Sequence, residues 1–215
     1  MPEAVFFDLD GTLADTAPDL AAALNRLQAE HQLAPSPLEQ LRPQVSNGVR
    51  GMLGVGFGLT PDAPRYPAIA ERFLQLYASA LCVETRLFAG IDEVLSHLDG
   101  SGITWGIVTN KAERFARPLI EALGLTSRCA CIVGGDTAAR PKPFADPLLY
   151  ACSSAGVAPA DSLYIGDDIR DIQAGKAAGM RTIAAAYGYL GSSPPVSSWS
   201  ADAIIGHPLD LLPLL

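Results

Sequence analysis

The stretch Val5-Phe6-Phe7-Asp8-Leu9-Asp10-Gly11-Thr12 is a hydrophobic run that ends in two carboxylates, a glycine and a hydroxyl. Residues 4–7 are apolar and β-favouring, which is typical of a strand covered on both faces in a parallel sheet. Asp8 and Asp10 lie two apart, so in extended backbone both point to one side, where a cation, a proton or a phosphate-binding environment must neutralise them. Gly11 lets backbone N–H groups approach a ligand closely. The stretch therefore predicts a buried strand and a reactive loop that suits a carboxylate nucleophile, a divalent metal and a second carboxyl group for acid–base chemistry.

The composition is that of a soluble globular protein. The chain has 215 residues, 49% of them hydrophobic and 18% charged, which allows one good core or a core domain with a smaller second domain. A net charge of −8 argues against nucleic acid or an anionic membrane as a partner, because both need a basic face. No signal-peptide pattern or membrane-length apolar run occurs, so we expect a cytoplasmic protein. Four cysteines without C-x-x-C spacing are expected to be reduced core thiols: Cys82, Cys129, Cys131 and Cys152.

Residues 15–87 are predicted to form an all-helical insertion. Thr16-Ala17-Pro18-Asp19 is typical of a helix start, with Thr16 as the cap and Asp19 completing a capping box. Apolar residues repeat at helical spacing over 20–27 and again over 69–80, and no strand-like run of any length interrupts the block. The expected division is therefore a core of residues 1–14 and 88–215 and a helical domain of residues 15–87.

After residue 90 helical and strand-like segments alternate. Strands are predicted at 103–108, 130–133, 162–165, 182–185 and 203–205, and helices at 92–98, 115–123, 147–155 and 169–178. Repeated alternation with apolar strands indicates an α/β fold, in which a Rossmann-like parallel sheet lies between helices.

Four of the predicted strands are followed by polar residues: Asp8 and Asp10, Thr109 and Asn110, Lys142, and Asp167 and Asp168. In open α/β sheets, ligands bind outside the carboxyl ends of the strands. Each group alone is better explained as a capped turn or a solvated loop. If the four groups had no shared function, their position at the same edge of the sheet would be a coincidence. We therefore predict a functional site at this edge.

The same residues resemble, in order, the four motifs of the haloacid dehalogenase-like hydrolases. These motifs are Asp8-Leu9-Asp10-Gly11-Thr12, Thr109-Asn110, Lys142-Pro143 and Gly166-Asp167-Asp168-Ile169-Arg170-Asp171, and the match covers essentially the whole chain. The helical block resembles the inserted cap of the subgroup that includes phosphoglycolate phosphatases and N-acetylmuramic acid 6-phosphate phosphatase. One departure is Ala145, because the third motif commonly reads Lys-Pro-x-Pro.

The resemblance implies a role for each carboxylate. Asp8 would be the nucleophile that forms an aspartyl-phosphate, and Asp10 would protonate the leaving oxygen and later take a proton from water. Mg²⁺ would be held by the Asp8 carboxylate, the Asp10 backbone carbonyl and Asp167, an all-oxygen set that suits a hard cation. Asp168 and Asp171 would support these ligands, although Asp171 is equally well explained as an acid in the first turn of a helix.

The resemblance also implies a phosphate-binding set. Lys142 would neutralise the phosphoryl oxygens together with Asp8, the alternative being a solvated loop lysine. Thr109 and the Asn110 amide would hold the remaining oxygens, and backbone N–H groups around Leu9 and Asp10 would add further donors.

The cap segment Ser46-Asn47-Gly48-Val49-Arg50 is expected to reach the substrate. Its glycine permits close approach, and Arg50 could pair with a substrate carboxylate, which both phosphoglycolate and muramic acid 6-phosphate carry. A surface arginine on a helix explains Arg50 equally well.

The leading hypothesis is a Mg²⁺-dependent phosphatase for a small phosphorylated acid or sugar, acting as a monomer or homodimer. A dehalogenase would not need Asp10 or the metal-type Gly166-Asp167-Asp168. A phosphomutase keeps both aspartates of the first motif and differs in the cap. A receiver-like module, in which Asp8 is phosphorylated by a partner, fits poorly with the large cap and the second acid.

Overall fold

A computed structural model describes residues 1–191 and 194–215. Its centre is a six-stranded sheet in the order β5-β4-β1-β6-β7-β8, with every neighbouring pair parallel. The strands are β1 (Ala4–Phe7), β4 (Thr104–Val108), β5 (Ile132–Val133), β6 (Ser162–Gly166), β7 (Arg181–Ala185) and β8 (Ala203–Ile205). β1 is buried throughout, as expected of a central strand. The predicted α/β class is confirmed.

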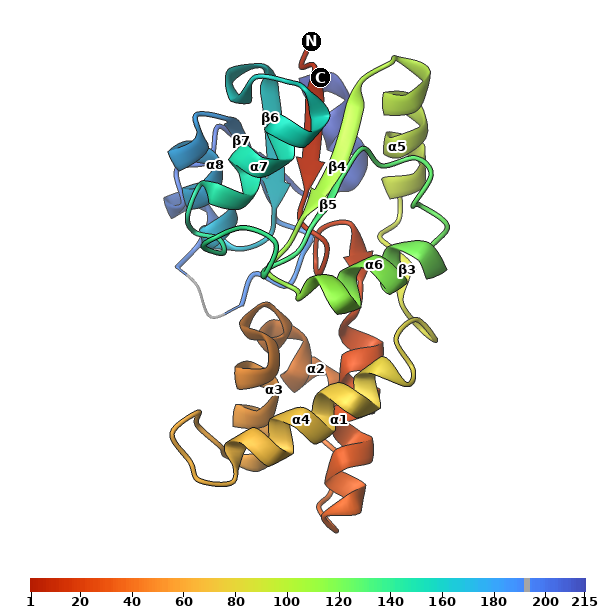
Figure 1. Cartoon of the computed structure of the whole chain (residues 1–215), viewed down its shortest axis with the longest axis vertical. Coiled ribbons are helices and arrows are strands. Elements are labelled where there is room, and N and C mark those ends of the chain that lie inside the picture. Colours follow the sequence, from red (N-terminus) through yellow and green to blue (C-terminus); the bar gives the residue numbers. More distant parts are fainter. Residues whose placement is uncertain (192–193) are drawn as a thin grey trace.

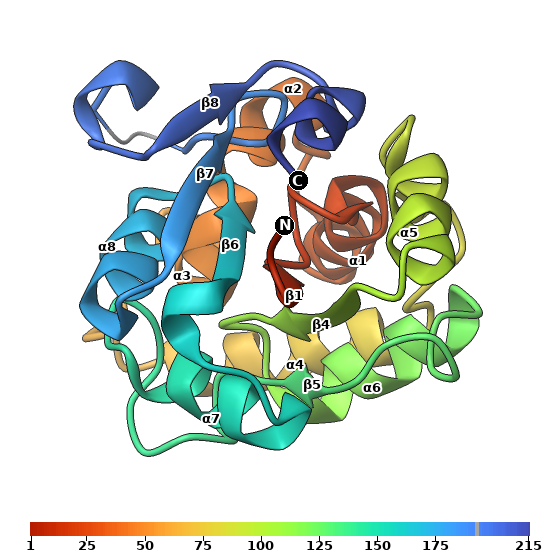
Figure 2. The same cartoon turned by 90° about the horizontal axis from the view of Figure 1, so that it is seen from above.

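Helices cover both faces of this sheet (Figure 2). Alternate residues of β1 point to opposite faces: Phe7 packs in the cluster that includes Leu95 and Leu119, and Phe6 in the cluster that includes Leu148 and Ala174. One face therefore carries α5 (Ile91–Gly100) and α6 (Glu113–Ala122), and the other carries α7 (Asp146–Ala155) and α8 (Ile169–Ala178). These helices agree with the predicted ones to within two residues at each end.

The insertion forms a separate group of helices at the opposite end of the molecule from the two termini (Figure 1). It contains α1 (Ala17–Glu30), α2 (Leu38–Leu41), the 3₁₀ helix η1 (Arg42–Asn47), α3 (Gly48–Phe57) and α4 (Tyr66–Ala78), packed around a hydrophobic cluster of their own. None of the helices in the described ranges combines the length and apolar character that crossing a bilayer requires.

Two short strands join this helical group to the sheet domain. β2 (Ala14–Asp15) and β3 (Arg86–Leu87) pair antiparallel, so the outgoing and returning chains lie side by side. Sequence analysis did not find this pair, because a two-residue strand has no periodicity to detect.

The start of α1 corrects one prediction, since neither Thr16 nor Asp19 caps the helix in the expected way. The Thr16 side chain makes no capping bond; instead the hydroxyl of Tyr189 accepts hydrogen bonds from the backbone of Thr16 at 2.7 Å and Ala17 at 3.0 Å. Asp19 accepts hydrogen bonds from the backbone N–H groups of 83–85 and from the Thr85 hydroxyl. Partners far along the chain therefore replace the local capping box. Their hydrogen bonds hold the two segments that join the helical group to the sheet domain, one at Thr16 and the other at residues 83–85.

Candidate active site

The site lies where the carboxyl ends of β1, β4 and β6 meet the helical insertion. Asp8 follows β1, Thr109 follows β4 and Asp167 follows β6, and pairing of β1 with both neighbours brings these positions together. A cavity of about 310 Å³ opens between this edge and helices α3 and α4. Its lining includes the predicted residues Asp8, Asp10, Thr109, Asn110 and Lys142.

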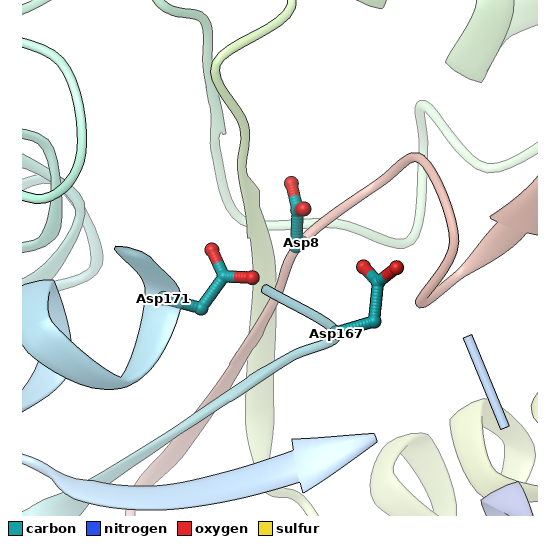
Figure 3. Close-up of side chains that lie close together, drawn as sticks. All are labelled: Asp8, Asp167 and Asp171. Atoms are coloured by element: carbon teal, nitrogen blue, oxygen red, sulfur yellow. The ribbon is translucent and has the colours of Figure 1, made fainter. Parts of the chain in front are cut away.

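Three buried carboxylates meet at this edge: Asp8, Asp167 and Asp171 (Figure 3). They can present oxygens within 4.8 Å of one another. Both Asp167 oxygens are held in place, one by the Thr12 hydroxyl at 2.9 Å and the other by the Tyr189 backbone N–H at 2.8 Å. Burial, together with the charges of Asp8 and Asp171, raises the pKa of Asp167 well above its ordinary value. Such a set of oxygen donors fits a divalent cation, which would allow the carboxylates to be ionised together.

Gly11 allows this cluster to form because it has no Cβ atom. Its backbone adopts a φ of +88°, and a Cβ atom there would lie 2.2 Å from a carboxylate oxygen of Asp167. Glycine therefore meets both demands of this position, the left-handed turn and the close approach to Asp167.

Asp171 lies where both of the explanations left open by the sequence would place it. It completes the capping box of α8 by accepting the Asp168 backbone N–H at 3.0 Å, and it also lies in the carboxylate cluster. Burial raises the pKa of Asp171 to about 7, although the neighbouring Lys142 acts in the opposite direction.

Lys142 is buried, which excludes a solvated loop lysine. Its ammonium lies 2.9 Å from Asp8 and 2.7 Å from Asp171, and it donates to the Tyr164 hydroxyl at 2.7 Å. Burial alone would lower the pKa of Lys142, but the two carboxylates outweigh burial and raise it. The Asn110 side chain accepts the Lys142 backbone N–H and donates to its carbonyl, each at 3.0 Å. Asn110 therefore positions the lysine, a role that its place in the motif did not indicate.

Asp10 is held away from the carboxylate cluster. Lys111 Nζ contacts its carboxylate at 2.9 Å, and the Thr16 hydroxyl donates to it at 2.5 Å. Sequence analysis did not single out Lys111. The only available signal was its position directly after Thr109 and Asn110, at the end of a strand that leads into the site.

Arg170 joins the sheet domain to the insertion. It donates two hydrogen bonds to the Asp168 carboxylate, at 2.7 and 2.8 Å, and one at 2.5 Å to the backbone carbonyl of Ser46. Burial alone would raise the pKa of Asp168, but the hydrogen bonds and charge of Arg170 lower it.

The structure does not bring Arg50 to the cavity of Asp8. Arg50 is exposed and lines a second hollow, on the outside of the insertion, together with Gln44 and Asn47. Arg114, at the start of α6, lines the main cavity instead. Leu9 is fully buried and its carbonyl accepts the backbone N–H groups of 12–14, which shapes the turn after β1.

Comparisons with known proteins agree with this arrangement. A model of the haloacid dehalogenase-like hydrolase family matches residues 5–185. An N-acetylmuramic acid 6-phosphate phosphatase from Pseudomonas aeruginosa is 42% identical over 99% of this chain and 94% of its own length. A phosphoglycolate phosphatase from Xanthomonas campestris is 46% identical over 98% of this chain and 95% of its own.

A solved structure supports the fold over the same extent. The crystal structure of a predicted phosphoglycolate phosphatase from Haemophilus somnus has a TM-score of 0.87 at 27% identity, and the likeness covers 99% of this chain and 97% of the other. Motifs, fold and relatives agree along nearly the full length of the chain, which belongs to the haloacid dehalogenase-like hydrolases.

Proposed function

We propose that this hydrolase is a Mg²⁺-dependent phosphatase that acts on a small phosphorylated acid or sugar through an aspartyl-phosphate on Asp8. The observation that carries the proposal is the position of Asp8, which lines the cavity directly after the central strand β1. Its carboxylate is paired with the Lys142 ammonium, which lies 2.9 Å from Oδ1. A carboxylate that is paired with a cation and open to a cavity is an available nucleophile.

In the first step, an Asp8 oxygen attacks phosphorus while the bond from phosphorus to the leaving oxygen breaks and Asp10 gives that oxygen a proton. In the second, water attacks the aspartyl-phosphate, Asp10 accepts a proton from the water, and inorganic phosphate leaves. Contacts to Lys111 and Thr16 orient Asp10 beside the cavity and apart from the carboxylate cluster. Lys142 and Thr109 are positioned to bind phosphoryl oxygens.

The donor set favours Mg²⁺ as the cofactor. Asp8, Asp167 and the Asp10 backbone carbonyl are the proposed ligands, and Asp171 is a further candidate because of its place in the cluster. Bound Mg²⁺ would supply positive charge that offsets the carboxylates and the phosphoryl oxygens.

We also propose that residues 15–87 act as a cap that limits the access of water to Asp8. Support comes from the hydrogen bond between Arg170 and Ser46, which joins the two parts across the cavity. A closed cavity suits aspartyl-phosphate chemistry, because water must enter only after the leaving group has gone.

The substrate we propose first is 2-phosphoglycolate, with N-acetylmuramic acid 6-phosphate as the alternative, since relatives named for each align with nearly the whole chain. The test is Mg²⁺-dependent phosphate release from a panel holding both compounds and several sugar phosphates, compared by kcat/KM. A single strongly preferred ester would identify the substrate. Absence of release from every ester, in protein shown to bind Mg²⁺, would contradict the proposal and favour a mutase or a phospho-accepting module.

A further inference from the structure

The segment Tyr187-Gly188-Tyr189, shortly after β7, lies against the carboxylate cluster and has no role in the proposed chemistry. Gly188 packs so closely on the cluster that a Cβ atom there would lie 2.2 Å from the Cβ atom of Asp167. The Tyr187 hydroxyl donates to the backbone carbonyl of Thr12 at 3.0 Å, and the backbone N–H of Tyr189 donates to Asp167 at 2.8 Å. The segment is therefore fixed to the sheet domain on both sides of Gly188.

The side chain of Tyr189 extends from this fixed segment into the insertion. The residue is 6% exposed, and its ring packs in the hydrophobic cluster of the insertion. Burial and the charge of Asp15 raise the pKa of Tyr189, so the hydroxyl keeps its proton. It donates that proton to Asp15 at 2.9 Å and accepts the backbone N–H groups of Thr16 and Ala17. With one bond donated and two accepted, the hydroxyl has no capacity for a further partner.

Thr16 connects this hydroxyl to Asp10. Its backbone N–H is bound by Tyr189 at 2.7 Å, and its own hydroxyl donates to the Asp10 carboxylate at 2.5 Å. Thr16 is fully buried, so its side chain has little freedom once its backbone is fixed. A chain of hydrogen bonds therefore runs from Asp167 through Tyr189 and Thr16 to the proposed acid–base group.

Capping of α1 explains only part of this arrangement. The first N–H groups of a helix need acceptors, and a threonine at this position usually supplies one from its own side chain. Thr16 makes no such bond, because its hydroxyl is directed to Asp10. Tyr189 supplies the missing acceptor and so leaves the Thr16 hydroxyl available for Asp10.

We propose that Tyr189 is a positioning residue for Asp10: its hydroxyl holds the start of α1 so that the Thr16 hydroxyl stays on Asp10. Tyr189 itself does not touch the substrate in this role. The inference rests on the proposed phosphatase function and deepens it.

Amide hydrogen exchange tests the structural part without any measurement of activity. The N–H groups of Thr16 and Ala17 precede the hydrogen bonds within α1, yet both should be protected because Tyr189 accepts them. Tyr189→Phe keeps the ring and removes the acceptor, so both amides should exchange about tenfold faster, the effect of losing one hydrogen bond. Tyr187→Phe is the matched control, because its hydroxyl binds Thr12, and it should leave the exchange of these two amides unchanged.

Kinetics with 2-phosphoglycolate and N-acetylmuramic acid 6-phosphate test the connection to Asp10. Tyr189→Phe should lower kcat about tenfold and leave KM within about twofold, because a misplaced acid–base group weakens the chemical step and not binding. Thr16→Val should lower kcat at least as much, whereas Thr16→Ser, which keeps the hydroxyl, should retain most of it. The Tyr189→Phe/Thr16→Val double variant should be no slower than Thr16→Val, because the connection is already broken. Tyr150→Phe, an exposed position on α7, is the control and should change neither constant.

Three results would overturn the inference and leave the proposed function standing. They are rapid exchange of the Thr16 and Ala17 amides in the wild-type protein, a wild-type kcat for Tyr189→Phe, and losses that multiply in the double variant. The first requires no substitution, so it decides the matter even if a variant folds poorly. An Asp8→Asn variant that still releases phosphate would instead contradict the proposed function itself.

Discussion

The two walls of the cavity are built in opposite ways. On the sheet side, charged groups are close together and most of them are paired, as Lys142 is with Asp8 and Asp171, and Arg170 is with Asp168. On the side of the insertion, the wall is mostly apolar, and its lining includes Leu20, Val45, Val49, Met52 and Phe73. Charged groups that are already paired and held in place suit a reaction whose charges are the same for every phosphate ester. A mostly apolar wall suits selection among leaving groups.

The difference predicts that substitutions on the two walls have different effects. Changes on the sheet side should lower activity on all substrates alike. Changes on the insertion side should alter the ranking of substrates and leave the chemistry in place.

The sharpest test of the sheet side is Asp8→Asn. The amide cannot act as the nucleophile, so phosphate release should fall by more than about a thousandfold on every substrate. Asparagine has nearly the same shape, and circular dichroism should show an unchanged fold. Turnover near the wild-type rate would show that the paired network is not the reaction centre.

Lys142→Met should have the next largest effect, on both activity and stability. Removing this buried ammonium leaves Asp8 and Asp171 uncompensated, which costs about 3–5 kcal/mol of unfolding free energy, and the loss of a phosphate-binding charge should lower kcat by about a hundredfold. Urea unfolding and phosphate release measure the two effects. Lys176→Met is the control, because Lys176 is exposed on α8, and it should change neither quantity; similar behaviour of the two variants would contradict the role given to Lys142.

Affinity for Mg²⁺ should rise with pH. The raised pKa values of Asp167 and Asp171, the latter about 7, mean that the metal-free cluster holds protons that the ion must displace. For one displaced proton on a group with a pKa of about 7, affinity should fall about fivefold between pH 7 and pH 6 and change little above pH 8. Calorimetry in buffers of different ionisation enthalpy would count the released protons. Affinity that is constant between pH 6 and pH 8 would be inconsistent with this description of the cluster.

The smallest expected effect compares two arginines. Arg114→Ala should lower kcat/KM by about fivefold for esters that carry a carboxylate, because Arg114 lines the cavity and is a cation that could pair with that carboxylate. Arg50→Ala tests the sequence-based prediction that Arg50 binds that carboxylate. A loss only in the Arg50 variant would support the sequence-based prediction and would require the insertion to move when substrate binds.

Sequence analysis was most accurate where the signal is local. The strand before Asp8 and the helix over 169–178 were predicted with the bounds that the structure has, because apolar runs, glycines and caps mark them directly. The strand ends also identified the edge of the sheet at which Asp8, Lys142 and Asp167 meet.

The remaining features depend on partners far along the chain. Tyr189 takes the capping role expected of Thr16 from 173 residues away, and Lys111 reaches Asp10 across 101 residues. Neither contact leaves a pattern in neighbouring residues. The position of Arg50 likewise depends on how η1 and α3 rotate against the sheet domain, which the helical periodicity of the insertion does not determine.

The strand order also affects how this enzyme folds while it is being synthesised. β1 leaves the ribosome before the other strands of the sheet, but it lies at the centre of the sheet, where Ala4 pairs with Thr104 on one side and Ser162 on the other. This apolar strand, which leads to the proposed nucleophile Asp8, must therefore wait until β6 has been synthesised before both its edges are covered. Such distant pairing is slow, and it exposes an uncovered strand to aggregation. We therefore expect nascent chains that end before β6 to be the species most dependent on chaperones, and catalytic activity to appear only after β6 and Asp167 have emerged.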